Sequence, residues 1–418
     1  MRKFTDFIYI CNRICNLVYL ILVEMMKKTT LFACLLIIGV MPILAQEPLI
    51  RPEEGKTLLE RVSKDGKTIA SSSMNLQFYT SGAAYLTDGE LDEAAFKINK
   101  VRLEVLGSFG KDFSYHFRQS FNKYSNPHSL DNLSSSVECA LVNWRMNDRF
   151  TLTVGKQSIQ LSGYEFWVNS IKVREFSDFN NNIACWQAGV NGAIRLSDTQ
   201  MLNLQVVNNR AGTEEETFIY GRPEEVGKVR VPMLSTANWD AYFFDRGLNL
   251  RYSASWGQLA SKRNILYLTA GNVWQKGLVV AYVDLMYSRE GLDSKGLISE
   301  LSATRPEGGV TAQHVSYFTT IANFDYRIHD HWNLYVKGAY ETGSVYKANG
   351  FYEKGLYRRT WNVQACAEYF PMRNSELLIF LHLLHKNHGM TSRAKALGAE
   401  SYSSQRVSLG LVYTIPVF

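Results

Sequence analysis

The chain is 418 residues long, 46% hydrophobic and 20% charged, with a net charge of only +6. Basic and acidic residues are nearly balanced, so the chain lacks the excess of positive charge that is typical of nucleic-acid binding. We therefore expect no nucleic-acid partner. The length would suit roughly two or three soluble domains, but no Pro/Ser-rich spacer or long charge run divides the chain after its N-terminus. We therefore expect one large domain.

The N-terminus has the features of an export signal. Two lysines precede a short apolar run that ends at Ala45. This pattern is typical of a secretory signal, and the run is shorter than the roughly 20 residues of a membrane-spanning helix. We predict that residues 26–45 are a signal peptide and that residues 1–25 are an extension from a start codon assigned too early. A membrane anchor in residues 1–25 is the alternative, and residues 46–73 are expected to form a short periplasmic segment.

From Met74 onward the sequence alternates between apolar and polar residues. In residues 112–122, for example, Phe113, Tyr115 and Phe117 alternate with polar side chains. Such alternation predicts strands with one apolar and one polar face. The segments last roughly 10–14 residues, which exceeds the typical globular strand and suits a tilted strand that crosses a bilayer.

The ends of these segments and the connections between them favour a membrane barrel over a soluble sandwich. Aromatic residues gather at the ends, as expected for girdles at the two lipid–water interfaces. Short turns alternate with long polar connections, which is the pattern of an outer-membrane barrel. Roughly fifteen strands are recognisable, and a stretch near residues 236–244 leaves room for one more.

We therefore predict an all-β fold, a transmembrane antiparallel β-barrel of about 16 strands over residues 74–418. Its surroundings would be the lipid of the outer membrane of a Gram-negative bacterium. The last strand closes on Phe418 and resembles the assembly signal of outer-membrane proteins, so the barrel-assembly machinery is an expected partner.

Sequence motifs give no support for an enzyme. The G-x-S-x-G elbow, the H-E-x-x-H motif and the P-loop are absent from the sequence. The histidines His382, His385 and His388 are spaced for a helix, whereas their surroundings predict a strand on which His385 faces away from the other two. We expect no metal, no cofactor and no catalytic residue, although a barrel enzyme and an adhesive or structural barrel stay open as alternatives.

The segment from Lys156 to Ile183 is rich in side chains that need shelter, such as Tyr164, Phe166 and Phe179. We predict that it folds back into the barrel as a constriction loop. Its charged residues are Lys156, Glu165, Lys172, Arg174, Glu175 and Asp178. A wide lumen discriminates poorly between solutes, so a narrower zone with charge at close quarters would set selectivity.

Motifs in and beyond this segment resemble the Bacteroidetes branch of the phosphate-selective porin O/P family. They include Gly155-Lys156-Gln157, the S-G-Y-E-F run that starts at Ser162, and the stretch from Met286 to Asp293. The resemblance covers roughly residues 74–418. It implies a homotrimer of sixteen-stranded channels with a constriction loop and basic residues along the bore.

The expected function is that of an outer-membrane porin for passive diffusion of small hydrophilic solutes. A preference for anions such as phosphate is implied by the family, but the arginine ladder of its founding members has no motif-by-motif match here. Strand parity predicts lumen-facing basic candidates at Arg102, Arg118, Arg195, Arg251, Lys337 and Arg358.

Overall fold

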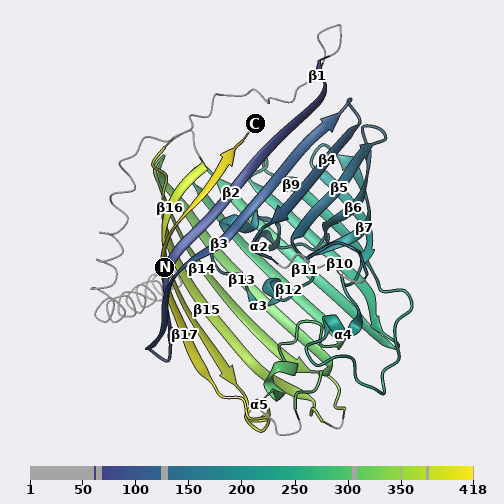
Figure 1. Cartoon of the computed structure of the whole chain (residues 1–418), viewed down its shortest axis with the longest axis vertical. Coiled ribbons are helices and arrows are strands. Elements are labelled where there is room, and N and C mark those ends of the chain that lie inside the picture. Colours follow the sequence, from purple (N-terminus) through teal and green to yellow (C-terminus); the bar gives the residue numbers. More distant parts are fainter. Residues whose placement is uncertain are drawn as a thin grey trace, which may run out of the picture. The chain divides into compact units, whose positions relative to one another are not determined.

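Sixteen antiparallel strands form a closed ring in the computed structural model of the chain (Figure 1). The structure describes residues 61–62, 68–123, 130–303, 308–349, 351–372 and 376–417. The expected signal peptide, the extension before it and the terminal Phe418 lie outside the described residues.

Each strand of the ring pairs with its neighbours in the sequence, and the ring closes where β17 pairs with β2. A short additional strand, β1 (Arg61–Val62), pairs with β2. The strands are β2 (Thr68–Thr87), β3 (Glu90–Phe109), β4 (Phe113–Ser120), β5 (Val137–Arg145), β6 (Phe150–Ser158), β7 (Trp186–Ser197), β8 (Gln200–Asn208), β9 (Met233–Phe243), β10 (Leu248–Ala260), β11 (Arg263–Lys276), β12 (Val279–Leu292), β13 (Gln313–His329), β14 (Trp332–Val345), β15 (Gly355–Tyr369), β16 (Glu376–Met390) and β17 (Tyr402–Pro416).

The expected barrel is confirmed, and the strand missing from the sequence count is β9. Its pattern is weak because the small residues Ser235 and Ala237 face outward, whereas the apolar Leu234 is buried inside. The first strand of the ring begins at Thr68, six residues before the expected start at Met74. A strand with small or polar residues on its outer face carries little periodic signal.

Side chains alternate between an apolar outer face and a buried inner face, as β12 illustrates. Val283 and Leu285 are 45% and 42% exposed on the outside, whereas Tyr282, Asp284 and Met286 point inward and are buried. An apolar outer band is what a barrel in lipid requires. No helix in the part of the chain that the structure describes is long and apolar enough to span a membrane.

The two rims of the barrel differ in their connections. One rim carries short turns such as 110–112, 198–199 and 330–331, and both the start of β2 and the end of β17 lie there. The opposite rim carries most of the long connections, including 209–232 and 293–312. Two connections at the long-loop rim, 88–89 and 261–262, are tight turns, which departs from the strict alternation expected from the sequence.

Short helices occur in the long connections (Figure 1). The connection between β6 and β7 holds α2 (Tyr164–Trp167), η2 (Ser170–Lys172) and α3 (Asp178–Asn181). The outer connections hold α4 (Glu214–Thr217), η3 (Ser299–Ser302) and α5 (Ser392–Lys395).

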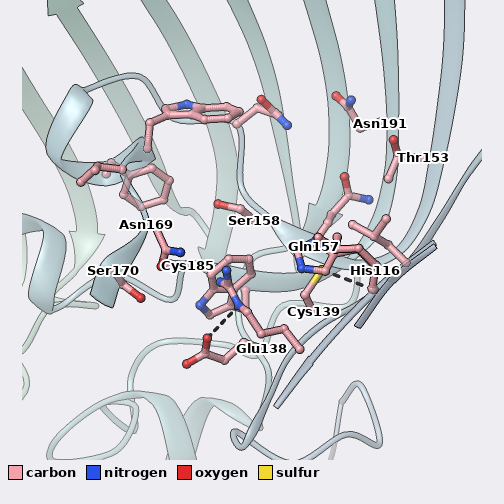
Figure 2. A pocket seen from close by; sticks show the side chains of 18 of the residues that line it. His116, Glu138, Cys139, Thr153, Gln157, Ser158, Asn169, Ser170, Cys185 and Asn191 are labelled. Carbon is pink, nitrogen blue, oxygen red and sulfur yellow. Dashed lines mark hydrogen bonds and ion pairs between the residues drawn. The ribbon is translucent and has the colours of Figure 1, made fainter. Parts of the chain in front are cut away.

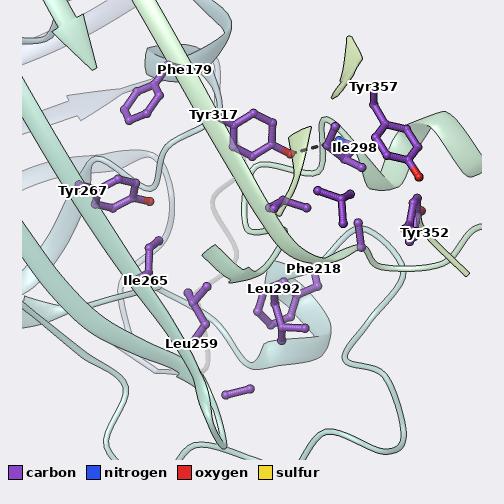
Figure 3. Close-up of a cluster of buried hydrophobic side chains, with 14 of the residues drawn as sticks. Phe179, Phe218, Leu259, Ile265, Tyr267, Leu292, Ile298, Tyr317, Tyr352 and Tyr357 are labelled. Carbon is purple, nitrogen blue, oxygen red and sulfur yellow. Dashed lines mark hydrogen bonds between the residues drawn. The ribbon is translucent and has the colours of Figure 1, made fainter. Parts of the chain in front are cut away.

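A hydrophobic core lies inside the long-loop end of the barrel rather than between two layers (Figure 3). It joins Phe179 of the β6–β7 connection to Tyr267 and Tyr317 of the wall. Outer connections add Phe218, Ile298 and Tyr352 to the same cluster. Burial of these side chains removes apolar surface from water and fills this side of the channel mouth.

Candidate functional site

Residues 159–185, which we call the lumen segment, cross the interior of the barrel. The Ser162 backbone N–H donates to hydroxyl groups on β10 and β11. The N–H groups of Tyr164 and Glu165 donate to the two carboxylate oxygens of Asp284 on β12, at 2.8 and 2.9 Å. Hydrogen bonds from the start of a helical turn to a carboxylate are a common way to satisfy these backbone donors.

Glycine is required where the lumen segment meets the wall. A Cβ atom on Gly271 of β11 would lie 2.9 Å from the backbone N and Cα of Gly163. Gly163 itself has a φ of +114°, a backbone conformation that favours glycine. The S-G-Y-E-F run therefore docks against β11 because neither backbone carries a side chain at the contact.

A second set of contacts holds the other end of the lumen segment. The Asp178 carboxylate accepts hydrogen bonds from Arg358 on β15 and Lys386 on β16. The N–H groups of Asp178 and Phe179 donate to Glu341 on β14, at 2.9 and 3.1 Å. Both cationic and anionic side chains of the barrel wall therefore hold α3 in place.

The lumen segment is also tied to itself through Glu165, whose side chain is buried. The Glu165 carboxylate accepts from Lys337 Nζ on β14 at 2.8 Å, and from Ser177 Oγ and Asn180 Nδ2 at 2.7 and 2.6 Å. A buried carboxylate with this many donors is stabilised in its charged form. Glu165 therefore joins both helical turns of the segment to the wall.

The middle of the lumen segment reaches across to β3. Arg102 is fully buried and donates to Asn169 Oδ1 at 2.6 Å and to Ser170 Oγ at 3.0 Å. Arg174 is buried against β15, where it pairs with Glu368 at 3.2 Å. Since the segment also contacts Asp284 on β12, it touches inward-facing side chains on nearly opposite sides of the ring.

A cavity of about 880 Å³, which we call the lateral cavity, lies between the lumen segment and the inner faces of β3 to β7 (Figure 2). Its charged lining residues are Lys100, Arg118, Lys123 and Glu138. Arg118 pairs with Glu138 at 3.1 Å and stacks over the ring of Trp186 at 4.4 Å. Three cations therefore face one carboxylate in this cavity.

Lys100 differs from the other two cations of the lateral cavity. Its Nζ donates to Ser170 Oγ at 2.9 Å, and within the described ranges no carboxylate oxygen lies within 4.0 Å of it. Lys123, by contrast, pairs with Glu138 at 2.9 Å. The charge of Lys100 is thus the one in this cavity that is least compensated by a direct partner.

A second cavity of about 440 Å³, which we call the rim cavity, lies beside the lumen segment toward the short-turn rim. Lys172 is exposed there, and among the described residues it forms no ion pair within 4.0 Å. The charged residues that line the rim cavity are Lys172, Arg174, Arg327, Lys337, Asp325 and Glu368. Cations again outnumber carboxylates.

The basic residues expected along the bore have several different environments. Arg102, Lys337 and Arg358 hold the lumen segment, a structural use that strand parity did not predict. Arg251 pairs with Asp240 at 2.9 Å and lies 3.4 Å from the ring centroid of Trp167. Arg195 is exposed near the short-turn end of β7.

Two expectations about the constriction loop need correction. Lys156 does not belong to the loop but to β6, where it pairs with Asp131 at 2.9 Å and both side chains are buried. Arg174 is not a solvated charge that can be reversed freely, because it is buried, pairs with Glu368 and stacks on Phe380 at 4.4 Å. Reversal of Arg174 would place two carboxylates together in a buried site, which is strongly destabilising. Glu175 pairs with Arg406 of β17 at 3.0 Å.

Sequence reasoning missed Lys100, Lys123, Lys386 and Arg406. Lys100 lies two residues before Arg102 in a predicted strand, and Lys386 lies four residues after the inward-facing His382. Strand parity could therefore have found both residues. Lys123 follows the end of β4, where parity no longer applies.

An outer connection is locked onto the lumen segment by a buried lysine. Lys295 pairs with Glu290, and its Nζ lies 4.4 Å from the ring centroid of Phe179 and 4.6 Å from that of Tyr267. Asp293 accepts from the backbone of the same connection and from Tyr317. Burial, together with the nearby Glu290, raises the pKa of Asp293. The outer connection and the lumen segment thus share one packed cluster.

A closed antiparallel barrel with an apolar outer face, a polar lumen and an inward-folded segment defines an outer-membrane channel. The sequence pattern of phosphate-selective porin O and P matches residues 75–415, and the chain belongs to this family. It is therefore an outer-membrane porin of a Gram-negative bacterium that allows passive diffusion of small hydrophilic solutes.

Several solved structures share the fold at low sequence identity. The outer membrane channel DcaP of Acinetobacter baumannii is 12% identical, with a TM-score of 0.58 over 86% of this chain and 100% of that one. An anion-selective porin from Comamonas acidovorans is 9% identical, with a TM-score of 0.56 over 83% and 100%. Salmonella typhi OmpF in complex with daunomycin is 10% identical, with a TM-score of 0.51 over 85% and 100%. No curated protein sequence is significantly similar to the chain.

Proposed function

We propose that this porin prefers small anions and that the lumen segment is its constriction. The observation that carries the proposal is the excess of cations over carboxylates in both cavities beside the segment. Lys100 and Lys172 contribute most, because neither has a carboxylate partner within the described residues. Charge that is not compensated locally acts on a passing ion at close quarters. The family name makes phosphate one candidate anion.

The path for solutes is expected to run along β3 to β7. The hydrophobic core fills the long-loop end on the opposite side, and the lumen segment packs against β10 to β16 through its hydrogen bonds. The larger of the two cavities lies on the β3–β7 side, where hydroxyl and amide side chains face it. Polar side chains at a lumen wall replace part of the hydration of a permeating ion.

Reversal potentials under a KCl gradient test this proposal. We expect the wild-type channel to favour chloride over potassium, and Lys100→Gln with Lys172→Gln to lower that permeability ratio by roughly two-fold or more. Lys111→Gln, in an exposed short turn and lining neither cavity, is the matched control and should leave the ratio unchanged. Cation preference in the wild type, or an unaltered ratio in the double variant, would refute the anion proposal.

We also infer that three copies of the chain associate through the side of the barrel that carries the short strands. Strands β4, β5, β6 and β8 have 8 or 9 residues, whereas β10 to β17 have 13 to 17. A tilted strand of 8 residues covers about 19 Å, less than the roughly 25 Å of the apolar band. A neighbouring copy of the chain that covers these short strands would shield the part of the apolar band that they do not span.

The hairpin of β2 and β3 is a second reason to place the trimer contact on the side of the short strands. Before Arg102, β3 pairs with β2 but has no partner in β4. Leu91, Phe96 and Ile98 lie on this free edge and are 63%, 83% and 67% exposed. An exposed apolar edge strand is a ready contact for another chain.

Charged residues on this edge should break the trimer. We expect Phe96→Asp with Ile98→Asp to convert trimers into monomers in detergent, because a buried charge opposes association. Phe244→Asp is the matched control, since Phe244 is also 83% exposed but lies in a short turn. Size-exclusion chromatography with light scattering would measure the mass, and intact trimers in the double variant would place the contact elsewhere.

A further inference from the structure

The outer wall formed by β12 to β15 carries a row of aromatic side chains toward the long-loop rim. Tyr287 on β12 pairs with Phe318 on β13, and the next two strands continue the row with the pair of Tyr340 and Trp361. Phe318, Tyr340 and Trp361 are exposed on the outside. Such a row marks the boundary between the apolar core of the membrane and the lipid headgroups. Residues beyond it toward the rim therefore lie at the level of the headgroups.

Two arginines follow the aromatic row on the same outward face. Arg289 lies two residues after Tyr287 on β12, and Arg359 lies two residues before Trp361 on β15, in each case toward the long-loop rim. Residues two apart in a strand share one face of the sheet. Both arginines are exposed. Their guanidinium groups thus leave the wall where lipid phosphates lie.

Neither arginine has an ionic partner in the protein. Within the described ranges, no carboxylate oxygen lies within 4.0 Å of either guanidinium group. The outward positions of β12 to β15 also hold no Asp or Glu, because every carboxylate of these strands faces inward. The inward carboxylates are those of Asp284, Glu290, Asp325, Glu341 and Glu368. Exposed cations without acidic neighbours favour an anionic partner.

Hydroxyl groups join the two arginines into a polar strip across four neighbouring strands. Ser316 on β13 pairs with Arg289, and Thr342 on β14 pairs with Arg359. The guanidinium carbon of Arg289 lies 4.2 Å from the ring centroid of Tyr346, which holds the side chain against the wall. A guanidinium group offers parallel N–H donors that match the oxygens of a phosphate group. The strip therefore has the chemistry of a phosphate-binding surface.

The polar strip is confined to one leaflet of the membrane. In outer-membrane barrels the long loops are extracellular, so the strip meets the outer leaflet. At the short-turn end of β12 to β15, outward positions hold residues such as Tyr326, Ile328, Trp332 and Tyr369, and no Lys or Arg. These strands also lie outside the proposed trimer contact, which uses the short strands β4 to β8. Lipid is thus the partner that this part of the wall meets.

We propose that the polar strip binds phosphate groups of anionic lipid in the outer leaflet. Arg289 and Arg359 would each contact a lipid phosphate, and the hydroxyl groups of Ser316 and Thr342 would add hydrogen bonds. The aromatic row would pack against the apolar part of the same lipid. A free phosphate ion has no apolar part for that row, so the expected source of the phosphate is a lipid.

The heat stability of the purified protein in detergent, with added lipid, tests the inference. The probes are lipopolysaccharide, the zwitterionic phosphatidylcholine and inorganic phosphate. A ligand that binds only the folded protein raises the temperature at which the compact electrophoretic form is lost. We expect lipopolysaccharide to raise this temperature, and phosphatidylcholine and inorganic phosphate at equal concentration to leave it unchanged.

Two double variants identify the contacts. Arg289→Gln with Arg359→Gln should raise the half-saturating concentration of lipopolysaccharide about 10-fold or more. Without lipid the variant should be as stable as the wild type, because both side chains are exposed. Arg246→Gln with Lys276→Gln is the matched control and should respond as the wild type. Arg246 also stacks on a tyrosine, Tyr242 at 5.3 Å, and Lys276 is exposed at the short-turn end of β11.

Several results would overturn this inference. They are an unchanged lipopolysaccharide response in the Arg289 and Arg359 variant, and an equal loss of the response in the control variant. Equal protection by phosphatidylcholine would show that the charge of the lipid is not used, and equal protection by inorganic phosphate would show that no lipid is needed. Both arginines lie outside the lumen, so chloride preference should be the same in this variant as in the wild type. The outcome is therefore independent of the proposed anion preference.

Discussion

Asp178→Ala should open the channel. The substitution removes the carboxylate that both Arg358 and Lys386 share, so two cations stay in the lumen without their partner. Loss of one partner from a buried charged cluster typically costs about 3–5 kcal/mol, enough to detach α3 from the wall. We expect single-channel conductance to rise about two-fold, because the released segment no longer narrows the lumen. The two freed cations should increase the preference for chloride at the same time.

Planar-bilayer recordings measure both effects of this substitution. Asp198→Ala, at an exposed turn between β7 and β8, is the control for a lost carboxylate and should leave conductance unchanged. A folded Asp178→Ala trimer with wild-type conductance would show that the lumen segment stays docked without this cluster, or that it does not limit the current.

Lys295→Met should lower the stability of the barrel more than most single substitutions. Glu290 would keep hydrogen bonds from Ser288 and Ser294 but lose its only buried cation within the described structure. An unpaired buried carboxylate is unfavourable by about 3–5 kcal/mol, whereas removal of both charges is often nearly neutral. We therefore expect a large drop in the urea midpoint for Lys295→Met and recovery of most of it in Glu290→Gln with Lys295→Met.

Heat- or urea-induced loss of the compact electrophoretic form would report these midpoints. Lys228→Met is the control, because Lys228 is 72% exposed and its partner Glu215 lies at 3.8 Å on the surface. No measurable shift is expected for the control, since exposed pairs contribute little. If Lys295→Met were as stable as the wild type, the outer connection would not depend on this cluster.

The fate of the predicted basic residues explains why site prediction was weaker than fold prediction. Parity assigns a side chain to one face of a strand, and it pointed correctly to the interior for Arg102, which the structure shows fully buried. Parity does not say whether a solute or a protein group meets that side chain. Arg102 meets Asn169 and Ser170, whereas Lys100, on the same strand, faces the lateral cavity.

The amino-acid sequence by itself determined the barrel. Every strand must present apolar side chains to lipid and form its backbone hydrogen bonds with neighbouring strands. Period-two alternation and segment length are therefore visible in each local stretch of the sequence. β9 was expected only as one further strand near residues 236–244, because its outer face holds Ser235 and Ala237, which are too small to mark a lipid-facing stripe.

Only the tertiary structure decided which charges are paired with protein groups and which face a cavity. Asp178 lies 208 residues from Lys386 in the sequence, yet their pairing holds the lumen segment against the wall. The surroundings of Lys100 likewise depend on Ser170 of the lumen segment, which lies 70 residues away in the sequence. Such pairings arise from ring closure and from the folding of a connection across the lumen, and no local pattern of residues encodes either one.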